Sequence, residues 1–169
     1  MPDEARADKH AFDAFVAREF AHVLALGLAL LRDEDDALDV AQETMLRAFR
    51  HWPEIATLDR PGAWTRRVAL NLVTDRMRAR TRVRRLGKNL MARRQGTIGD
   101  TSESMWDQTF WAEVAALPIR RRNATVLFYV VDLSIAEIAD ILQVAEGTVK
   151  SDLSRAREHL RRRLAAGES

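Results

Sequence analysis

The stretch that decides the fold lies near the end of the chain and reads SIAEIADILQVAEGTVKSDLSRAREHLRRRL, from Ser134 to Leu164. Ser134 stands three residues before Glu137, which is the spacing of a capping box, so a helix is expected over 135–142. A few residues then interrupt the apolar pattern, and a second helix is expected over 146–164. Two helices joined by a short turn are typical of a helix-turn-helix.

Each of these helices has one apolar face. In the first helix that face carries Ile135, Ile138, Ala139 and Leu142, and in the second it carries Val149, Leu153, Ala156, Leu160 and Leu164. The opposite face of the second helix is polar and basic, with Ser151, Ser154, Arg155, Glu158 and Arg162, and with Thr148 and Lys150 at its leading end. Small residues at that end suit entry into a major groove, and the free N–H groups suit a phosphate. The alternative is an amphipathic hairpin with a basic face in solvent.

Bulk composition narrows the class of protein. The chain has 169 residues, enough for one ordinary domain or two small ones, and a formal net charge of +2. Lys9, Lys88 and Lys150 are the only lysines, so arginine supplies most of the positive charge, which is compatible with nucleic acid. The absence of cysteine excludes disulfides and thiolate metal sites. We expect no apolar run near the 20 or so residues of a membrane helix and no secretory segment, which indicates a cytoplasmic protein.

Charge is unevenly distributed along the chain. Six acids fall in a stretch without Lys or Arg: Asp33, Glu34, Asp35, Asp36, Asp39 and Glu43. Between Asp75 and Asp100 there is no acid, and nine basic residues fall between Arg76 and Arg94. Solvated helix faces are one explanation of such blocks. We favour one polarised domain with two different partner surfaces.

The chain is predicted to be all-α. Ala, Leu, Arg and Glu dominate, and no sustained period-two pattern is present. Helices are expected near 9–31, 34–51, 61–80, 105–116, 119–131, 135–142 and 146–164. The segment 81–104 is Gly-containing and poor in apolar periodicity, so it is interpreted as a flexible basic linker between domains 1–80 and 105–169. Fully stretched, it would reach on the order of 80 Å.

Three stretches carry a family resemblance. The segment from Leu117 to Leu164, LPIRRRNATVLFYVVDLSIAEIADIL followed by GTVKSDLSRAREHLRRRL, resembles region 4 of the sigma-70 family in its extracytoplasmic-function (group IV) branch. DEDDALDVAQETMLRAFRHW, which begins at Asp33, resembles regions 2.1–2.2, and RPGAWTRRVALNLVTDRMRARTRVRR, which begins at Arg60, resembles regions 2.3–2.4. The GTVKS helix alone also resembles the output domains of two-component regulators. Together, in this order, the stretches imply two helical domains and an RNA polymerase sigma factor.

The resemblance implies a site for the −10 promoter element on the helix over 61–80. Trp64, Val68, Asn71 and Asp75 share one stripe, of which the first two are interpreted as core. By the chemistry of its own carboxylate, Asp75 would orient Asn71 or cap a neighbouring loop. By resemblance, Asn71 and the loop Leu58–Gly62 capture an unstacked base. Five arginines would hold the phosphates of the strand: Arg66, Arg67, Arg76, Arg78 and Arg80.

The acidic helix over 34–51 is expected to pack on one side and to bind on the other. Small residues form its packing stripe: Ala37, Ala41, Thr44 and Ala48, followed by Trp52. Leu46 stands among carboxylates on the opposite face, where either a protein partner or a lone exposed leucine would explain it. By resemblance this face docks on the clamp helices of the largest polymerase subunit, through Asp35, Asp39, Gln42, Glu43, Leu46 and Phe49.

The resemblance also implies contacts for the second domain. Ser151, Ser154 and Arg155 would read a −35 element and Lys150 would position the backbone, with Thr148 and Arg162 on the same surface. Further partners implied are the flap of the second largest subunit and an anti-sigma factor. The linker would span promoter elements on the order of 70 Å apart.

Two positions depart from the family pattern. Gln143 stands where the family often has Gly, and a left-handed conformation would cost Gln about 1 kcal/mol more, so we expect the turn to be built differently. Asp152 stands where the family often has a basic residue. It falls near the buried edge of the helix, so we expect an effect on packing or repulsion of phosphate.

No enzymatic pattern is found. The four histidines, His10, His22, His51 and His159, are scattered without a second ligand at metal spacing, and no phosphate loop or catalytic triad order is present. We therefore expect no catalysis, metal or cofactor. Two alternatives to a sigma factor are a stand-alone helix-turn-helix regulator and an interaction protein that titrates a polymerase subunit or an antagonist.

Overall fold

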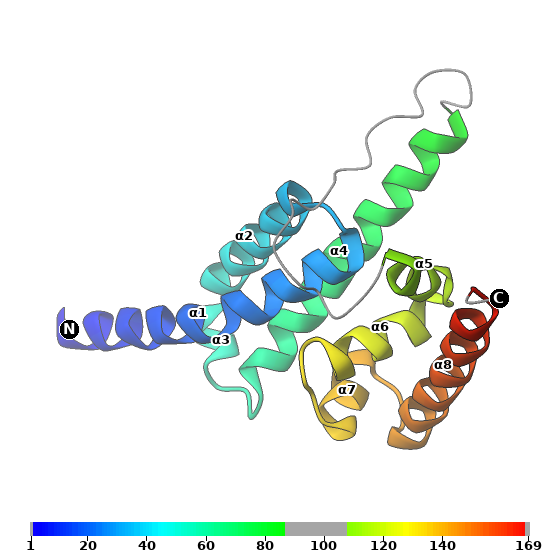
Figure 1. Ribbon diagram of the computed structural model, residues 1–169. Coiled ribbons are helices and arrows are strands. Elements are labelled where there is room, and N and C mark those ends of the chain that lie inside the picture. The colour runs from blue at the N-terminus through cyan, green and yellow to red at the C-terminus, as the bar shows by residue number, and fades with distance from the viewer. Residues whose placement is uncertain (1, 87–107, 168–169) are drawn as a thin grey trace. The chain divides into compact units, whose positions relative to one another are not determined.

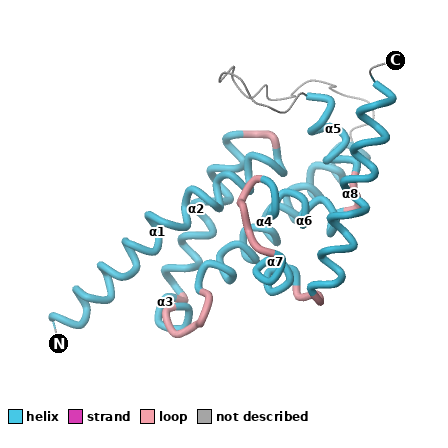
Figure 2. The backbone as a smooth tube through the Cα atoms, turned by 60° about the horizontal axis from the view of Figure 1, so that its bottom comes forward, coloured by secondary structure: helices cyan, strands magenta, loops and turns pink. Residues whose placement is uncertain are grey.

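The structure is a computed structural model that describes residues 2–86 and 108–167. The chain divides into two compact units, Met1–Thr97 and Ile98–Ser169. Every regular element among the described residues is a helix, and no strand occurs there (Figure 2). The prediction of two all-α domains is confirmed. Their predicted limits stay a prediction, and residues 87–104 of the predicted linker lie outside the described residues.

Over residues 2–86, the described part of the N-terminal unit forms four helices (Figure 1). These are α1 (Pro2–Leu31), α2 (Glu34–Arg50), the short α3 (Trp52–Ile55) and α4 (Pro61–Leu86). The three long helices pack against one another in pairs. Asp33 caps α2, because its side chain accepts a hydrogen bond from the Asp36 amide at 3.0 Å.

Small side chains let α1 and α2 approach closely, as the packing stripe predicts. All its members are buried: Ala37, Ala41, Thr44, Ala48 and Trp52. On α1, a methyl group added to Gly27 would lie 3.1 Å from the Cα and Cβ atoms of Ala37. Phe15, Ala48, Trp52 and Ile55 form a buried cluster, with Phe12 and Trp64 packed against it.

Several helix boundaries differ from the prediction: α1 begins at Pro2 instead of residue 9, α6 ends at Tyr129 instead of 131, and α8 ends at Gly167 instead of 164. Two further differences have a clear local cause. The helix expected over 34–51 ends at Arg50, and α3 follows as a separate element, because Pro53 lacks an amide hydrogen and cannot continue α2. The helix expected over 61–80 continues to Leu86. Arg is a good helix former, so the basic segment extends α4 even without an apolar stripe.

The expectation that no apolar run approaches the length of a membrane helix is wrong. Within α1, Lys9–Leu31 is long and apolar enough to cross a membrane. The same helix buries Phe15, Val23 and Leu26 inside the N-terminal unit. Core helices of globular units pass the same test, so the segment is weak support for a membrane span.

The C-terminal unit contains α5 (Gln108–Ala116), α6 (Ile119–Tyr129), α7 (Ile135–Leu142) and α8 (Glu146–Gly167). The capping box is confirmed: the Glu137 amide donates to Ser134 Oγ at 3.3 Å, and the Ser134 amide donates to Glu137 Oε2 at 2.9 Å. The long helix α8 packs against each of the other three. Its predicted apolar stripe is buried except for the half-buried Leu164.

The turn between α7 and α8 corrects the expectation for Gln143. This residue adopts φ 57° and ψ 47°, the left-handed conformation that a family glycine would favour. The amides of Gln143 and Val144 both donate to the Ala139 carbonyl, the latter at 3.1 Å. The hydrogen bonds that end α7 therefore hold Gln143 in the usual turn despite its side chain.

Candidate nucleic-acid and protein interfaces

The polar face of α8 lies open to solvent. Lys150, Ser154, Arg155 and Arg162 are exposed, and Thr148 and Ser151 are half-buried near the leading end. Nothing lies within 4 Å of the position of a Cβ atom on Gly147. All six residues predicted to contact the −35 element thus lie along the same helix, outside its buried stripe.

Asp152 fixes α8 against α6. It is only 3% exposed, and its Oδ2 atom accepts a hydrogen bond from Arg120 Nε at 2.7 Å. Arg121 Nε lies 3.9 Å from Oδ1 of the same carboxylate. The hydrogen bond to Asp152 raises the pKa of Arg120 above its ordinary value. Of the two effects expected for Asp152, the structure favours packing, because its charge is neutralised inside the unit.

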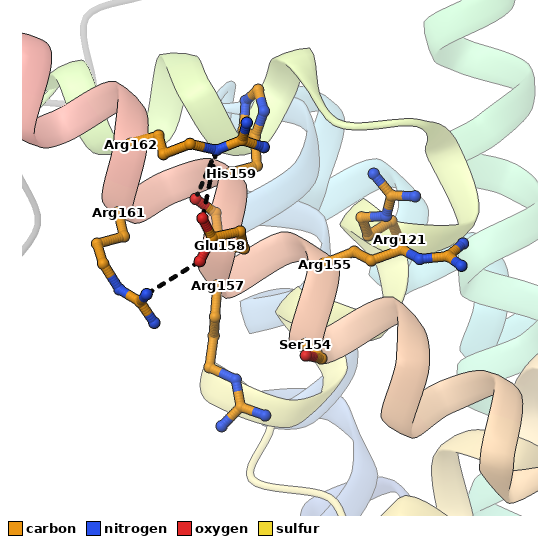
Figure 3. A pocket seen from close by; sticks show the side chains of 8 residues that line it. All are labelled: Arg121, Ser154, Arg155, Arg157, Glu158, His159, Arg161 and Arg162. Carbon is orange, nitrogen blue, oxygen red and sulfur yellow. Dashed lines mark hydrogen bonds and ion pairs between the residues drawn. The ribbon is translucent and has the colours of Figure 1, made fainter.

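A basic hollow of about 680 Å³ opens on α8 (Figure 3). Its lining consists of Arg121, Ser154, Arg155, Arg157, Glu158, His159, Arg161 and Arg162. Arg155 extends toward Arg121 of α6, whereas Arg157 and Arg161 project from another side of α8. Among the side chains that the structure describes, Arg155 pairs with none.

Glu158 partly neutralises the far end of this hollow. It accepts a hydrogen bond from Arg161 at 2.9 Å, and Arg162 Nε lies 3.5 Å from its Oε1 atom. Arg155 therefore carries a less compensated charge than Arg162, although both lie on the predicted surface.

In the N-terminal unit, α2 and α4 line a groove of about 640 Å³. We call it the α2–α4 groove. It is lined by Asp39, Gln42, Glu43, Leu46 and Arg47 of α2 and by Leu72, Asp75, Arg76 and Ala79 of α4. The groove therefore brings Asp75, a predicted −10 residue, beside four residues predicted to bind polymerase: Asp39, Gln42, Glu43 and Leu46.

Two large apolar side chains of α2 are exposed beside this groove. Leu46 is 51% exposed and Phe49 is 64% exposed, with the Phe49 ring edge-on to Phe12 at 5.3 Å. Asp35 and Asp39 are exposed on the same helix. The predicted binding face of α2 is therefore available to a partner.

The proposed −10 residues of α4 divide into two groups. Asn71 and Asp75 are exposed, and Asp75 lies 3.6 Å from the exposed Arg78. Arg67 is half-buried. Leu58 is exposed on the loop between α3 and α4, while Gly62 belongs to the first turn of α4. These residues form the accessible group.

The second group consists of Arg66, Arg76 and Arg80, which form ion pairs with carboxylates of α1 and α2. Arg66 is 8% exposed and its Nη2 atom lies 3.1 Å from Glu19 Oε2. Arg76 Nη2 lies 3.3 Å from Asp39, and Arg80 Nη2 lies 3.0 Å from Asp33.

This pairing bears on two expectations. The contacts of these three arginines with strand phosphates stay a prediction, in which the strand would compete with carboxylates of α1 and α2. The acidic and basic blocks also do not form two wholly separate surfaces, because α2 and α4 lie side by side and part of their charge is compensated between them.

Comparisons with known proteins cover both units. A family model described as "Sigma-70 region 2" matches residues 6–83, and one described as "Sigma-70, region 4" matches residues 108–160. The ECF RNA polymerase sigma factor SigM of Mycobacterium tuberculosis is 31% identical over 93% of this chain and 79% of its own length. The chain belongs to the extracytoplasmic-function branch of the sigma-70 family.

A second relative supports the same assignment, and two solved structures match the fold. SigW of Bacillus subtilis is 29% identical over 94% of this chain and 91% of its own. The structure of RpoE in complex with the anti-sigma factor NepR from Bartonella quintana matches the fold with a TM-score of 0.75, at 24% identity over 92% of this chain and 97% of that one. CnrH in complex with the cytosolic domain of CnrY matches with a TM-score of 0.67, at 24% identity over 96% and 94% of the two chains. Sigma factors are non-catalytic initiation factors that act on RNA polymerase in the cytoplasm.

Several residues of the α2 face, the α2–α4 groove and the basic hollow on α8 are not among those predicted from the sequence. Leu38 is 38% exposed and lies 8 and 11 positions before Leu46 and Phe49, a spacing that would have indicated a shared face. Leu72 of α4 lines the α2–α4 groove, and Arg121 of α6 lines the basic hollow on α8. Both come from a second helix, so no pattern within one helix predicts them. The described residues contain no group of three His, Asp or Glu side chains fit to hold a metal ion.

Proposed function

We propose that this sigma factor divides promoter recognition between its two units. The C-terminal unit reads duplex DNA at a −35 element, and the N-terminal unit binds core polymerase and the opened −10 strand. The observation that carries the proposal is that each unit exposes a face of different chemistry. The face of α8 is basic and polar, whereas that of α2 is apolar and acidic.

On α8, Arg155 is the proposed base-reading residue. Its guanidinium is exposed and pairs with no other described side chain, so it can donate two hydrogen bonds to a guanine edge. Ser151 and Ser154 lie on the same face, and Lys150, Arg157 and Arg162 supply charge for phosphates. A bidentate contact is worth about 1–3 kcal/mol of base discrimination.

On α2, the proposed polymerase contacts are Leu46 and Phe49, with Leu38 added to them. Exposed apolar side chains in a row favour a protein partner over solvent. Asp35, Asp39, Gln42 and Glu43 would form the polar rim of that contact. The flap of the second largest polymerase subunit would contact the C-terminal unit.

For the −10 strand we propose Asn71, Asp75, Arg67, Arg78 and the loop at Leu58 as the principal contacts. An exposed amide can both donate to and accept from the edge of an extruded base. The energy of unstacking, a few kcal/mol, would be recovered by stacking and edge contacts.

We further propose an anti-sigma partner, because the sigma factor RpoE, whose structure matches this fold, was solved in complex with the anti-sigma factor NepR. We also propose a cytoplasmic location and no catalytic activity for this chain. A stand-alone helix-turn-helix regulator is disfavoured, because such a protein has no need of a region 2 match over residues 6–83.

Run-off transcription with purified core polymerase and genomic fragments tests the proposal. We expect promoter-specific initiation only when both core and this protein are present. Operator binding without core and without initiation would support the stand-alone regulator instead. Absence of both activities would favour an interaction protein.

A further inference from the structure

A buried ion pair joins α1 to the beginning of α4. Glu19 is 4% exposed and Arg66 is 8% exposed, and Arg66 Nη2 lies 3.1 Å from Oε2 and 3.4 Å from Oε1 of the carboxylate. His22, one turn along α1, contacts the same guanidinium through Nδ1 at 3.5 Å. The pair therefore connects elements that are 47 residues apart in the chain.

Glu19 also lies against the backbone of the first turn of α4. A Cβ atom on Gly62 would come within 2.7 Å of Oε1, so only glycine permits this approach. The first turn of α4 contains no acidic residue of its own. Because the N-terminal end of a helix carries a partial positive charge, Glu19 supplies from α1 the anion that α4 lacks.

This pair is poorly suited to stabilise the fold by itself. Among the described residues, Glu19 Oε2 lies 3.1 Å from Arg66 Nη2 but accepts no hydrogen bond of good geometry, and Arg66 Nε donates none. Removing two charges from water costs several kcal/mol, and the attraction offsets this only when the remaining hydrogen bonds are made. What the pair does specify is geometry, because it fixes where α4 begins relative to α1.

The position of that beginning matters for the proposed −10 site. The loop that carries Leu58 leads directly into this turn, and Asn71 follows Arg66 by five residues on the same helix. We infer that Glu19 is a positioning residue for −10 base capture, acting through Arg66 and Gly62. This inference rests on the proposed role of Asn71 and the loop.

Two variants test positioning separately from folding. Glu19→Leu combined with Arg66→Met replaces the pair by apolar side chains of similar size, which is often neutral for stability. Gly62→Ala keeps both charges but forces the carboxylate to move. Arg18→Ala is the matched control, because Arg18 approaches Glu19 Oε1 at 3.6 Å from solvent.

The first measurement needs no DNA. In the full chain, hydrogen exchange of the amides over 58–65 should accelerate about ten-fold in both test variants, while α2 and α8 stay unchanged. Unchanged exchange over 58–65 would overturn the inference at its structural step.

The second measurement uses holoenzyme and single-stranded DNA. Oligonucleotides selected from a random pool by the parent holoenzyme are compared with the same oligonucleotides carrying one changed −10 base. Discrimination should fall about ten- to a hundred-fold in the test variants, with core affinity unchanged. Equal discrimination in parent and variants would overturn the inference. A parent holoenzyme that does not discriminate would overturn the proposed role of Asn71 and, with it, the functional part of this inference.

Discussion

At the end of α7, Gln143 occupies a left-handed conformation that favours glycine. The side chain keeps one compensating contact, since Gln143 Nε2 donates to the Asp140 carbonyl at 3.3 Å. That contact is exposed, so it offsets little of the steric cost of a Cβ atom at positive φ. The turn between α7 and α8 is therefore held with some backbone strain.

Gln143→Gly should relieve that strain. We expect the C-terminal unit to gain about 1 kcal/mol, because glycine adopts positive φ without penalty. Hydrogen exchange of buried amides in α7 and α8 should slow about five-fold. Gln143→Ala serves as the control, because it removes the amide but keeps the Cβ atom. An equal gain from alanine would show that backbone conformation is not the cause.

Local chemistry was readable from the sequence at this scale, whereas distant pairing was not. Ser134 and Glu137 are three residues apart, so their capping box follows from spacing. The ion pair of Arg66 depends on how α1 packs against α4, and nothing near Arg66 in the sequence signals Glu19. At Gln143 the preference of one residue was overruled by two hydrogen bonds of the backbone.

Among the elements of the N-terminal unit, α4 is tied to both of its neighbours by Arg80. Its Nη1 atom donates to the Leu31 carbonyl at the end of α1 at 3.0 Å. Its Nη2 atom contacts Asp33 and Asp36 at the beginning of α2. One guanidinium thus satisfies a terminal carbonyl and two carboxylates around the α1–α2 junction.

Arg80→Ala should loosen that junction. The side chain is 42% exposed, so solvent screening limits the loss to about 1 kcal/mol, and added salt should reduce it further. Faster amide exchange in the last turn of α1 and the first turn of α2 is the measurement. Arg78→Ala is the control: its side chain is 73% exposed and lies 3.6 Å from Asp75. A similar effect of both variants would contradict a specific role for Arg80.

In the C-terminal unit, α5 is held to α8 by Glu113. Its carboxylate accepts a hydrogen bond from Arg163 at 3.1 Å and lies 3.2 Å from His159 Nε2. The hydrogen bond from Arg163, with His159 beside it, holds the pKa of Glu113 below its usual value.

The α5–α8 contact should therefore weaken in acid. Because the pKa of Glu113 is lower in the folded state, its contribution is complete above the ordinary glutamate pKa of about 4.3 and is lost as pH falls below it. Amide exchange in α5, corrected for intrinsic rates, should rise between about pH 4.5 and pH 3. Glu113→Gln should remove this pH dependence, and its persistence in the variant would assign it to another group.

Elements were largely predictable from sequence because helical periodicity and caps are local. The helices over 135–142 and from 146 were located correctly at their beginnings. Boundaries failed where periodicity was absent, as at Leu86, or where a proline made a short separate helix, as at α3. The α2 side of the groove and the α8 side of the hollow were predictable from helical periodicity. The opposite sides, from α4 and α6, depend on packing between helices and were not.

At the scale of the whole molecule, the face proposed to bind polymerase and the face proposed to read duplex DNA belong to different units. Substitutions should therefore impair polymerase binding and duplex reading separately. The apolar face of α2 belongs to one unit and the basic face of α8 to the other. A side chain exposed on one unit contributes little to folding of the other. Substitutions on the two faces should therefore affect different steps of initiation.

Leu46→Asp should impair only the polymerase step. In the proposed complex Leu46 would be buried against polymerase, so a carboxylate at this position would lose that apolar contact. The affinity for core polymerase should therefore fall at least about 30-fold. Val83→Asp, on an exposed apolar residue of α4, is the matched control and should leave affinity unchanged. Titration of labelled protein with core polymerase measures the effect, and equal losses from both variants would contradict a specific role for α2.

Arg155→Ala should impair only duplex reading. Core affinity should stay at the parent value, while holoenzyme loses about 1–3 kcal/mol of preference at one base pair of the −35 element. Arg157→Ala is the comparison, because an arginine that contacts only phosphate should weaken all sequences alike and lower the salt slope by about one. Competition among promoter duplexes that differ at single positions distinguishes the two patterns. Uniform weakening by Arg155→Ala would place that arginine on the backbone, and a parallel loss of core affinity would contradict the separation of the two faces.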